Sequence, residues 1–197
     1  MSLETSPVVS RRDRREFVEL PYRLHSTSEQ WIPPLRLERR LFLRPRFNPF
    51  FSEGEAQLFL ARRDGRVVGR ISAHVDRALN DYHDNRWGLF GFLELEDDPD
   101  VAEALFTAAE GWLRERGRDR MVGPMDFRMN DESGVLIEGY DREPMVRQSW
   151  HPPYYRELCE AASSKMAGTI FSRSEMCSSH IHRSIALLRP VPSSSAR

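Results

Sequence analysis

The sequence is poor in cysteine, in lysine and in long apolar runs. Its two cysteines, Cys159 and Cys177, form neither a disulfide framework nor a metal motif, and Lys165 is the single lysine among many arginines. No apolar run approaches the roughly 20 residues that a membrane-spanning helix needs. The N-terminal stretch MSLETSPVVSRRDRR has no apolar segment before its charges, so no secretory signal is expected. These absences favour a soluble, cytoplasmic protein.

The chain also carries almost no net charge. Its 29 basic and 30 acidic residues give −1 at neutral pH, which excludes bulk electrostatic attraction to nucleic acid or to an anionic membrane, although not a local patch. We therefore expect no nucleic-acid or membrane partner. A length of 197 residues with 40% hydrophobic and 30% charged side chains is typical of one globular domain that builds its own core.

The composition changes near residue 162. Residues 162–197 hold 10 serines, against 9 in residues 1–161, and their charge of +4 contrasts with −5 before them. Apart from a weak apolar run at Ile185–Leu188, this tail has no helical or alternating pattern, so we expect it to be disordered or loosely packed. The alternatives are a basic interaction tail and a shifted reading frame. The sequence thus predicts a domain over 1–161 and a serine-rich tail over 162–197.

The first third of the chain predicts two helices. Ser10 is a capping residue before a partly apolar stripe over 11–24, and Val8–Val9 just before it suits a short strand. Pro33-Pro34 can open a second helix that runs to Leu43, since proline is tolerated in a first turn. A loop over 46–54 follows.

The next segments predict a hairpin and a central strand. Residues 57–63 and 67–75 are extended runs separated by Asp64-Gly65, a dipeptide that suits a tight turn. Residues 87–95 are apolar on both faces, as in a central strand. Gly88 and Gly91 inside that strand indicate a bulge or a close approach of another backbone.

The remaining elements complete an α/β, or α+β, architecture. Asp98-Pro99 is a capped helix start, and the apolar spacing continues to Gly117. A short strand over 121–124, a polar loop over 128–147 with a small apolar patch at 135–137, and a helix over 152–161 follow. The sequence therefore predicts a mixed sheet flanked by helices.

Several polar clusters have a functional and a plain reading. The spacing of His74, Asp76, His83 and Asp84 matches no ligand frame, so no metal site is expected. Two other groups each have two interpretations. A set of arginines could bind an anion or form a solvated sheet edge, and a polar loop could line an acceptor pocket or form a plain turn. The arginines are Arg62, Arg63, Arg66 and Arg70, and the loop is Asn130, Asp131, Glu132, Ser133 and Gly134.

Four runs resemble the GNAT superfamily of acyl-CoA N-acyltransferases, in particular a bacterial subfamily whose members are largely uncharacterised. The resemblance spans about residues 8–161, and its runs are GRISAHVDRALNDYH, GLFGFLELEDDPDVAEALFTAAEGWLRERG, VGPMDFRMNDESGVLIEGYD and HPPYYREL. It implies transfer of an acyl group from acyl-CoA to a small-molecule amine. Family members continue with a Gly-Phe pair, a further strand and often a second domain, whereas here Glu160-Ala161-Ala162 leads into the tail. A non-catalytic GNAT-like domain, a truncated fragment and a homodimer therefore remain as alternatives.

The resemblance also implies where an acyl-CoA would lie. It places the cofactor along Leu93 and Leu95 of the central strand and at the helix start of Asp98 and Val101. GNAT enzymes present a glycine-containing loop there, whose backbone amides bind pyrophosphate. This chain has Glu96-Asp97-Asp98-Pro99-Asp100 instead, and these carboxylates would satisfy the donors and repel the phosphates. Acetyl-CoA or another acyl-CoA is the cofactor that the resemblance implies, and this acidic helix start opposes its binding.

Three residues are the catalytic candidates. The resemblance implies that Glu94, at the end of the central strand, is a general base, for which partial burial must raise its pKa; the plain reading is an exposed strand end. It implies that Tyr154 or Tyr155 protonates a leaving thiolate, although the usual Gly-Phe does not follow. The plain reading of both tyrosines is core cover with hydroxyls at the rim.

Overall fold

Eight strands form one mixed sheet in the computed structural model, which describes residues 2–164, 172–174 and 183–190. The strand order is β1-β2-β3-β4-β5-β8-β6, with β7 paired to β8 off this path. Strands β1 to β4 are antiparallel neighbours, β4 and β5 are parallel, and β8 is antiparallel to β5 and β6. Their bounds are β1 Leu3–Pro7, β2 Gly54–Arg63, β3 Arg66–Asp76, β4 Trp87–Leu95, β5 Arg120–Gly123, β6 Val135–Glu138, β7 Ser172–Ser174 and β8 Arg183–Pro190.

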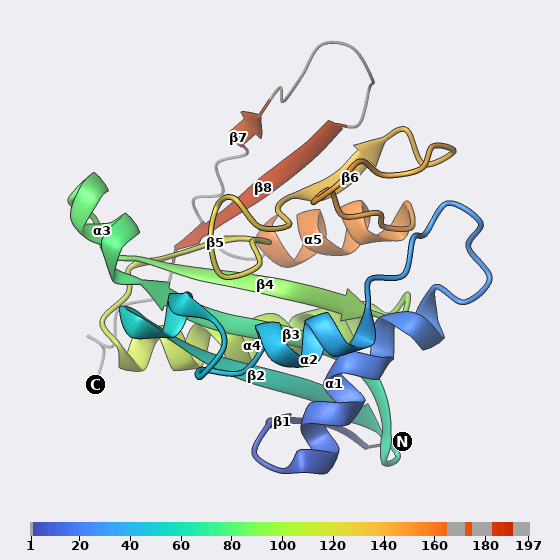
Figure 1. Cartoon of the computed structure of the whole chain (residues 1–197), viewed down its shortest axis with the longest axis horizontal. Coiled ribbons are helices and arrows are strands. Elements are labelled where there is room, and N and C mark those ends of the chain that lie inside the picture. Colours follow the sequence, from blue (N-terminus) through green and yellow to red (C-terminus); the bar gives the residue numbers. More distant parts are fainter. Residues whose placement is uncertain (1, 165–171, 175–182, 191–197) are drawn as a thin grey trace.

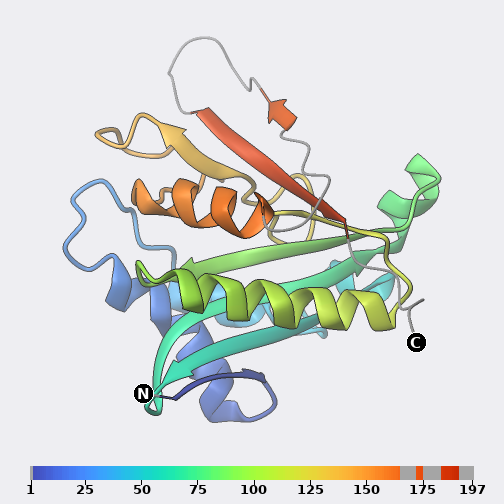
Figure 2. The ribbon, with the colours of Figure 1, turned by 180° about the vertical axis from the view of Figure 1, so that it is seen from behind.

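Helices cover both faces of this sheet. One face carries α1 and α2 (Figure 1), and the other carries α4 and α5 (Figure 2). Each face has its own apolar cluster, one around Phe17 of α1 and one around Leu105 of α4. The bounds are α1 Arg11–Leu24, α2 Arg36–Phe42, the 3-10 helix η1 Pro49–Ser52, α3 Arg77–His83, α4 Pro99–Glu115 and α5 Tyr154–Ser164. The predicted mixed sheet flanked by helices is confirmed.

Local signals placed most elements correctly. Ser10 and Asp13 form a capping box at the start of α1. Asp64 and Gly65 both have positive φ between β2 and β3, as a two-residue hairpin turn requires. Asp98 caps α4 with Pro99 in its first turn, and β4 has the predicted bounds.

Three predictions about elements were wrong. The first strand is Leu3–Pro7 rather than Val8–Val9, because β1 pairs residue for residue with the far end of β2. Helix α2 begins at Arg36, not at Pro33-Pro34, because the backbone of Leu35 is still extended and makes Leu35 the N-cap. The apolar patch predicted within a loop is strand β6.

The predicted tail also contains regular structure. Helix α5 runs on to Ser164, and the segment around Ile185–Leu188 lies in β8, which pairs with β5. An unpaired β5 edge would leave its backbone donors and acceptors open, and β8 satisfies them. The disorder expected for the rest of the tail falls on 165–171, 175–182 and 191–197, outside the described residues.

Strand β3 shows how the sheet separates its two faces. From Gly69 to Val75 the expected alternation holds, with Ile71 and Ala73 in the α4 cluster and Arg70 directed to α1. Val68 joins the α4 cluster instead of the α1 side, because a register shift opposite Ala61 displaces the alternation there.

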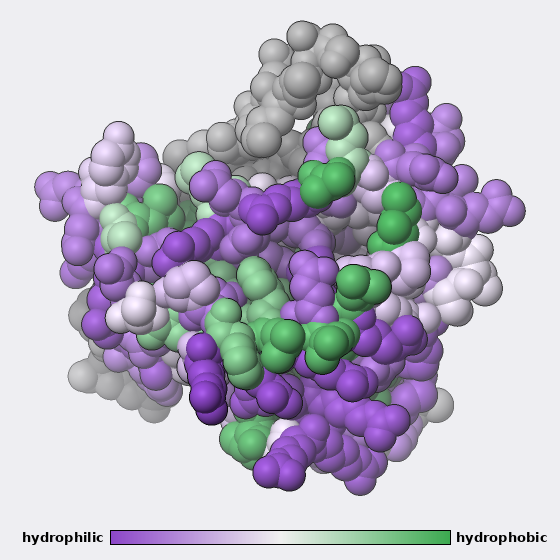
Figure 3. Space-filling view, in the orientation of Figure 1, coloured by the Kyte–Doolittle hydropathy of each residue, from purple (hydrophilic) through white to green (hydrophobic). Residues whose placement is uncertain are grey.

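Helix α2 lies on the surface of the molecule. None of its residues is buried, and hydrophobic side chains gather on the face of the molecule that carries it (Figure 3).

In the described part of the chain, no helix combines the length and the apolarity that a bilayer span requires.

Candidate functional site

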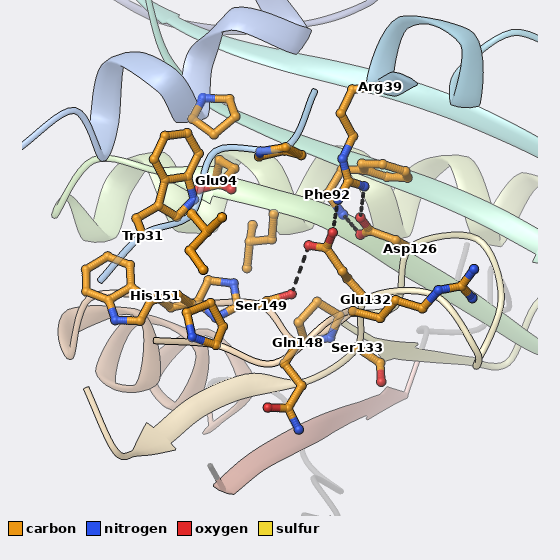
Figure 4. Close-up of a pocket in the computed structure, with 18 of the residues that line it drawn as sticks. Trp31, Arg39, Phe92, Glu94, Asp126, Glu132, Ser133, Gln148, Ser149 and His151 are labelled. Carbon is orange, nitrogen blue, oxygen red and sulfur yellow. Dashed lines mark hydrogen bonds and ion pairs between the residues drawn. The ribbon is translucent and has the colours of Figure 1, made fainter. Parts of the chain in front are cut away.

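A cavity of about 230 Å³ opens between the end of α1, the segment that follows it, β4 and the loops on either side of β6 (Figure 4). Apolar and polar side chains line it in similar measure, and most of its charged groups form the floor. The apolar and aromatic lining residues include Val18, Tyr22, Trp31, Ile32, Met145, Val146 and Trp150. The charged lining residues are Arg39, Arg70, Glu94, Asp126, Glu132 and Arg147.

A bulge in β4 creates the opening above this floor. Phe92 has a φ of 49°, and the register with β3 shifts beside it. Strand β5 pairs with β4 only at Trp87–Leu89. The chain after β5 stays beside β4 as far as Met125, whose amide donates to the Phe90 carbonyl oxygen at 2.7 Å. Gly91 is required here, because a Cβ atom would lie 2.1 Å from the Met125 carbonyl oxygen. The close backbone approach predicted from this glycine is confirmed.

Glu94 stands at the centre of a buried hydrogen-bond network. Its Oε2 accepts a hydrogen bond from the Tyr155 hydroxyl at 2.7 Å and lies 2.7 Å from Nε2 of His25. Arg70 lies 3.7 Å from its other oxygen. Burial alone would raise the pKa of Glu94, but His25 and Arg70 outweigh it and lower the pKa to about 2. The expectation of an exposed strand end was wrong, and so was that of a raised pKa.

Arg70 and His25 support this carboxylate from two elements. The Arg70 guanidinium donates to the Phe17 carbonyl oxygen at 2.6 Å and lies over the Phe17 ring, so Arg70 is no solvated sheet edge. His25 follows α1 and packs between Trp31 and Trp150. Among the described residues, His25 Nδ1 is a buried nitrogen without a hydrogen-bond partner.

Asp126 is the second carboxylate of the floor. Its Oδ1 accepts the Phe92 amide at 2.7 Å, and its Oδ2 lies 3.6 Å from Arg39, which also pairs with Glu132 (Figure 4). Burial raises the pKa of Asp126 to about 6, against the attraction of Arg39. A carboxylate with a pKa near neutrality is suited to accept a proton at physiological pH.

Tyr154 and Tyr155, the predicted proton donors, form hydrogen bonds with the backbone at the end of β4. The Tyr155 hydroxyl accepts the Leu95 amide at 3.0 Å, and the Tyr154 hydroxyl donates to the Leu95 carbonyl oxygen at 2.9 Å. Burial and the Glu94 charge raise the pKa of both hydroxyls, which keeps them protonated. Tyr155 is fully buried, so the prediction of a hydroxyl at the rim was wrong for it.

The start of α4 does not fit a pyrophosphate. Asp98 Oδ1 accepts the amides of Asp100 and Val101 at 3.0 and 3.4 Å, and Arg63 pairs with Asp98. The free amides that an acyl-CoA would need are therefore satisfied internally. Val101 and Leu95 have fully buried side chains, whereas Leu93 lines the cavity.

Two further polar clusters were singled out in the sequence, the arginines around the β2–β3 hairpin and the loop before β6. Arg62 pairs with Asp13 and Glu16 of α1, and Arg66 pairs with Glu96. These arginines thus meet carboxylates of the chain itself. In the loop before β6, Glu132, Ser133 and Gly134 line the cavity. This part of the loop therefore forms a pocket wall, and whether the pocket takes an acceptor stays a prediction.

The four residues of the metal hypothesis do not converge. His74 is buried beside Phe50 and Phe127, and burial lowers its pKa to about 3. Asp76 caps α3, and His83 stacks on Trp87. Within the residues that the structure describes, no three His, Cys, Asp or Glu side chains are grouped to hold a metal.

Sequence reasoning missed much of this floor. Asp126 lies within the VGPMDF run, but nothing local marks it as buried. His25 directly follows the first predicted helix and Arg39 lies inside the second, and neither belongs to a motif. Their role depends on contacts between residues far apart in sequence.

Comparison with solved structures identifies the fold. A phosphinothricin acetyltransferase of the GNAT superfamily from Sinorhizobium meliloti, in complex with AcCoA, matches all of this chain and 93% of its own, with a TM-score of 0.56 and 16% identity. This protein has a GNAT-like fold. A tandem GNAT protein from the clavulanic acid biosynthesis pathway matches 89% of this chain and 45% of its own, with a TM-score of 0.58 and 17% identity. No family model matches the sequence.

Two curated proteins are similar in sequence. A bacterial ceramide synthase from Caulobacter vibrioides (strain NA1000 / CB15N) is 43% identical over 171 residues, which are 86% of this chain and 44% of that protein. Protein YghO of Escherichia coli (strain K12) is 36% identical over 147 residues, which are 75% of this chain and 37% of that protein. The chain spans less than half the length of both relatives.

Proposed function

We propose that this chain binds the acceptor amine of an N-acyltransferase, and that the acceptor is a long-chain amino alcohol. A ceramide is an amide between a fatty acid and such an amino alcohol, and the relative named as a ceramide synthase is 43% identical over 171 residues. This likeness carries the proposal. The cavity supports it, because its apolar side chains suit an alkyl chain and the Glu94 and Asp126 carboxylates suit an ammonium group.

The two floor carboxylates divide the work on the amine. Glu94 stays ionised because its pKa is lowered to about 2, so it attracts the ammonium group. Asp126, whose pKa is about 6, is about nine-tenths ionised at pH 7 and can still accept a proton. An amine must lose its proton before its nitrogen lone pair can attack an acyl carbon. Asp126 is thus the proposed base, and Glu94, the base implied by family resemblance, is the proposed amine anchor.

The reaction then forms one bond and breaks one. The ammonium group loses one proton to Asp126, and its nitrogen then bonds to the acyl carbon of an acyl thioester. As the carbon–sulfur bond breaks, the nitrogen loses a second proton, which converts the leaving thiolate to a thiol. The thiolate leaves with the electron pair of the broken bond. Because the α4 start does not fit a pyrophosphate, we assign no residue of this chain to the leaving group.

An acylation assay tests the proposal. The purified chain is incubated with a long-chain acyl-CoA and sphinganine, and the amide is measured by mass spectrometry. We expect amide formation that falls at least about 100-fold in Asp126→Asn, as expected for loss of a general base. Glu53→Gln, an exposed carboxylate away from the cavity, is the matched control. Equal activity of Asp126→Asn and the native chain would refute the role of Asp126.

The alternative is a non-catalytic GNAT-like domain, and the filled α4 start favours it. Thermal melting separates the two, because a ligand that binds the folded state raises its melting temperature. Stabilisation by sphinganine alone, with no amide formed and no shift with acyl-CoA, would mean an amine-binding domain without transferase activity. Absence of a sphinganine shift in the folded chain would refute the amine site.

A further inference from the structure

The segment that borders the cavity on one side exposes large apolar side chains. Between residues 32 and 47, Ile32 is 54% exposed, Leu35 73%, Leu37 68% and Phe47 55%. The segment includes α2, in which no residue is buried. In a globular domain, several exposed large apolar residues on one segment indicate an interaction surface.

The same segment is strongly basic, although the whole chain is not. Residues 32–47 contain five arginines and one acidic residue, Glu38, which gives +4. Arg36 and Arg40 pair with Glu19 of α1, whereas Arg44 and Arg46 are exposed at the far end of the segment. The segment therefore exposes apolar and basic side chains together.

The opposite side of the cavity also exposes apolar side chains and arginines, but its net charge is only +1, because residues 142–147 include the exposed Glu143. In the segment 142–147, Met145 is 58% exposed and Val146 93% exposed, and the flanking Arg142 and Arg147 are exposed as well. Both segments line the cavity, one through Ile32 and Arg39 and the other through Met145 to Arg147. Hydrophobic patches on this side of the molecule are visible in Figure 3. We call residues 32–47 and 142–147 the two lips.

We propose that the two lips dock on an anionic lipid bilayer. Exposed aliphatic side chains beside arginines are the composition that binds such a surface, since the apolar groups enter the interface and the cations meet the lipid phosphates. The charge complementarity is local, and it overrides a net charge that by itself predicts no membrane partner.

Docking through the lips has a consequence for the site. It turns the open side of the cavity to the bilayer, so that a long-chain amine can pass from the membrane to the carboxylate floor without its alkyl chain crossing water. This consequence rests on the proposed function, whereas the docking itself does not.

Vesicle flotation tests the docking with the purified chain. We expect the chain to float with vesicles of phosphatidylglycerol and phosphatidylcholine in equal parts, and to stay behind with phosphatidylcholine alone. High salt should weaken the binding, because it screens the arginines. The double substitution Leu35→Ser/Leu37→Ser, which leaves every cavity-lining residue in place, should weaken binding by at least about tenfold.

Matched controls make the result specific. Val9→Ser/Tyr82→Ser removes two equally exposed apolar side chains, at 79% and 84%, outside the lips, and should bind as the native chain does. No flotation of the folded chain with anionic vesicles, or an equal loss in this control, would overturn the proposal. So would a dimer that Leu35→Ser/Leu37→Ser converts to a monomer, because the lips would then bind a second copy. Flotation needs no amine or acyl donor, so its outcome is separate from that of the acylation assay.

Discussion

Glu94→Gln replaces a buried anion by a neutral group of the same shape. Glutamine cannot attract Arg70 and His25 as the carboxylate does. Since the introduced glutamine resembles the protonated form of Glu94, the stability difference between the two proteins reports on the ionisation of Glu94. We expect the substitution to lower the free energy of unfolding at neutral pH.

The magnitude follows from the pKa of Glu94, which is lowered from 4.5 to about 2 in the folded protein. Each pKa unit corresponds to about 1.4 kcal/mol, so the ionised carboxylate contributes about 3 kcal/mol. A carboxyl group whose folded pKa lies below its unfolded pKa stabilises the protein fully above the unfolded pKa. The contribution is lost as the pH falls from 4.5 towards about 2.

Urea denaturation of both proteins across this pH range measures the effect. The difference in unfolding free energy should be about 3 kcal/mol at pH 7 and should shrink towards zero as the pH approaches 2. Other buried groups such as His74 titrate in both proteins and largely cancel. Glu53→Gln is the exposed control and should show no such difference. A stability loss in Glu94→Gln that does not change with pH would refute the reasoning, because it would trace the loss to packing rather than to charge.

Three further predictions concern the same floor. Asp126→Asn should raise the free energy of unfolding at pH 7 by up to about 3 kcal/mol, since burial raises the pKa of Asp126 from 3.8 to about 6. This stabilisation should vanish as the pH falls to 4, and a loss of stability at pH 7 would contradict the prediction. Gly91→Ala should cost about 4 kcal/mol or more, or prevent folding, because its Cβ would lie 2.1 Å from the Met125 carbonyl oxygen. Unchanged melting would show that the segment around Met125 can move away from β4 freely. Tyr155→Phe should cost about 1–3 kcal/mol, because the Leu95 amide and Glu94 both lose a partner, whereas Tyr82→Phe on the surface should cost nothing measurable.

The elements that the sequence predicted correctly are those with a local cause. Ser10 caps α1, Asp64-Gly65 turns the hairpin and Asp98-Pro99 begins α4, and each acts within a few residues of its own position. The β6 strand was missed for the opposite reason. Its four residues have too short a pattern to distinguish a strand from a loop, and pairing with β8, about 50 residues later, defines it.

The site could be predicted only in part. The position of Glu94 at the end of β4 followed from the strand and from family resemblance, but its environment did not. His25 lies 69 residues away in sequence and Tyr155 lies 61 residues away. These contacts reverse the expected direction of the Glu94 pKa shift, and no spacing along the chain encodes them. Arg70 was misassigned for the same reason, because its charge reads as exposed until the packing of α1 is known.

The two sides of β4 differ in which of their polar groups can meet a ligand. On the side of the tyrosines and α4, the chain's own groups bind the backbone of Leu95 and the α4 amides through Tyr154, Tyr155 and Asp98. On the side of the cavity, Glu94 and Asp126 face a space that none of the described side chains fills. Two buried carboxylates beside such a space are stable only because each has a cationic or amide partner. We therefore propose an amine acceptor rather than an acyl-CoA as the ligand of this chain, and binding of the two should be measured separately.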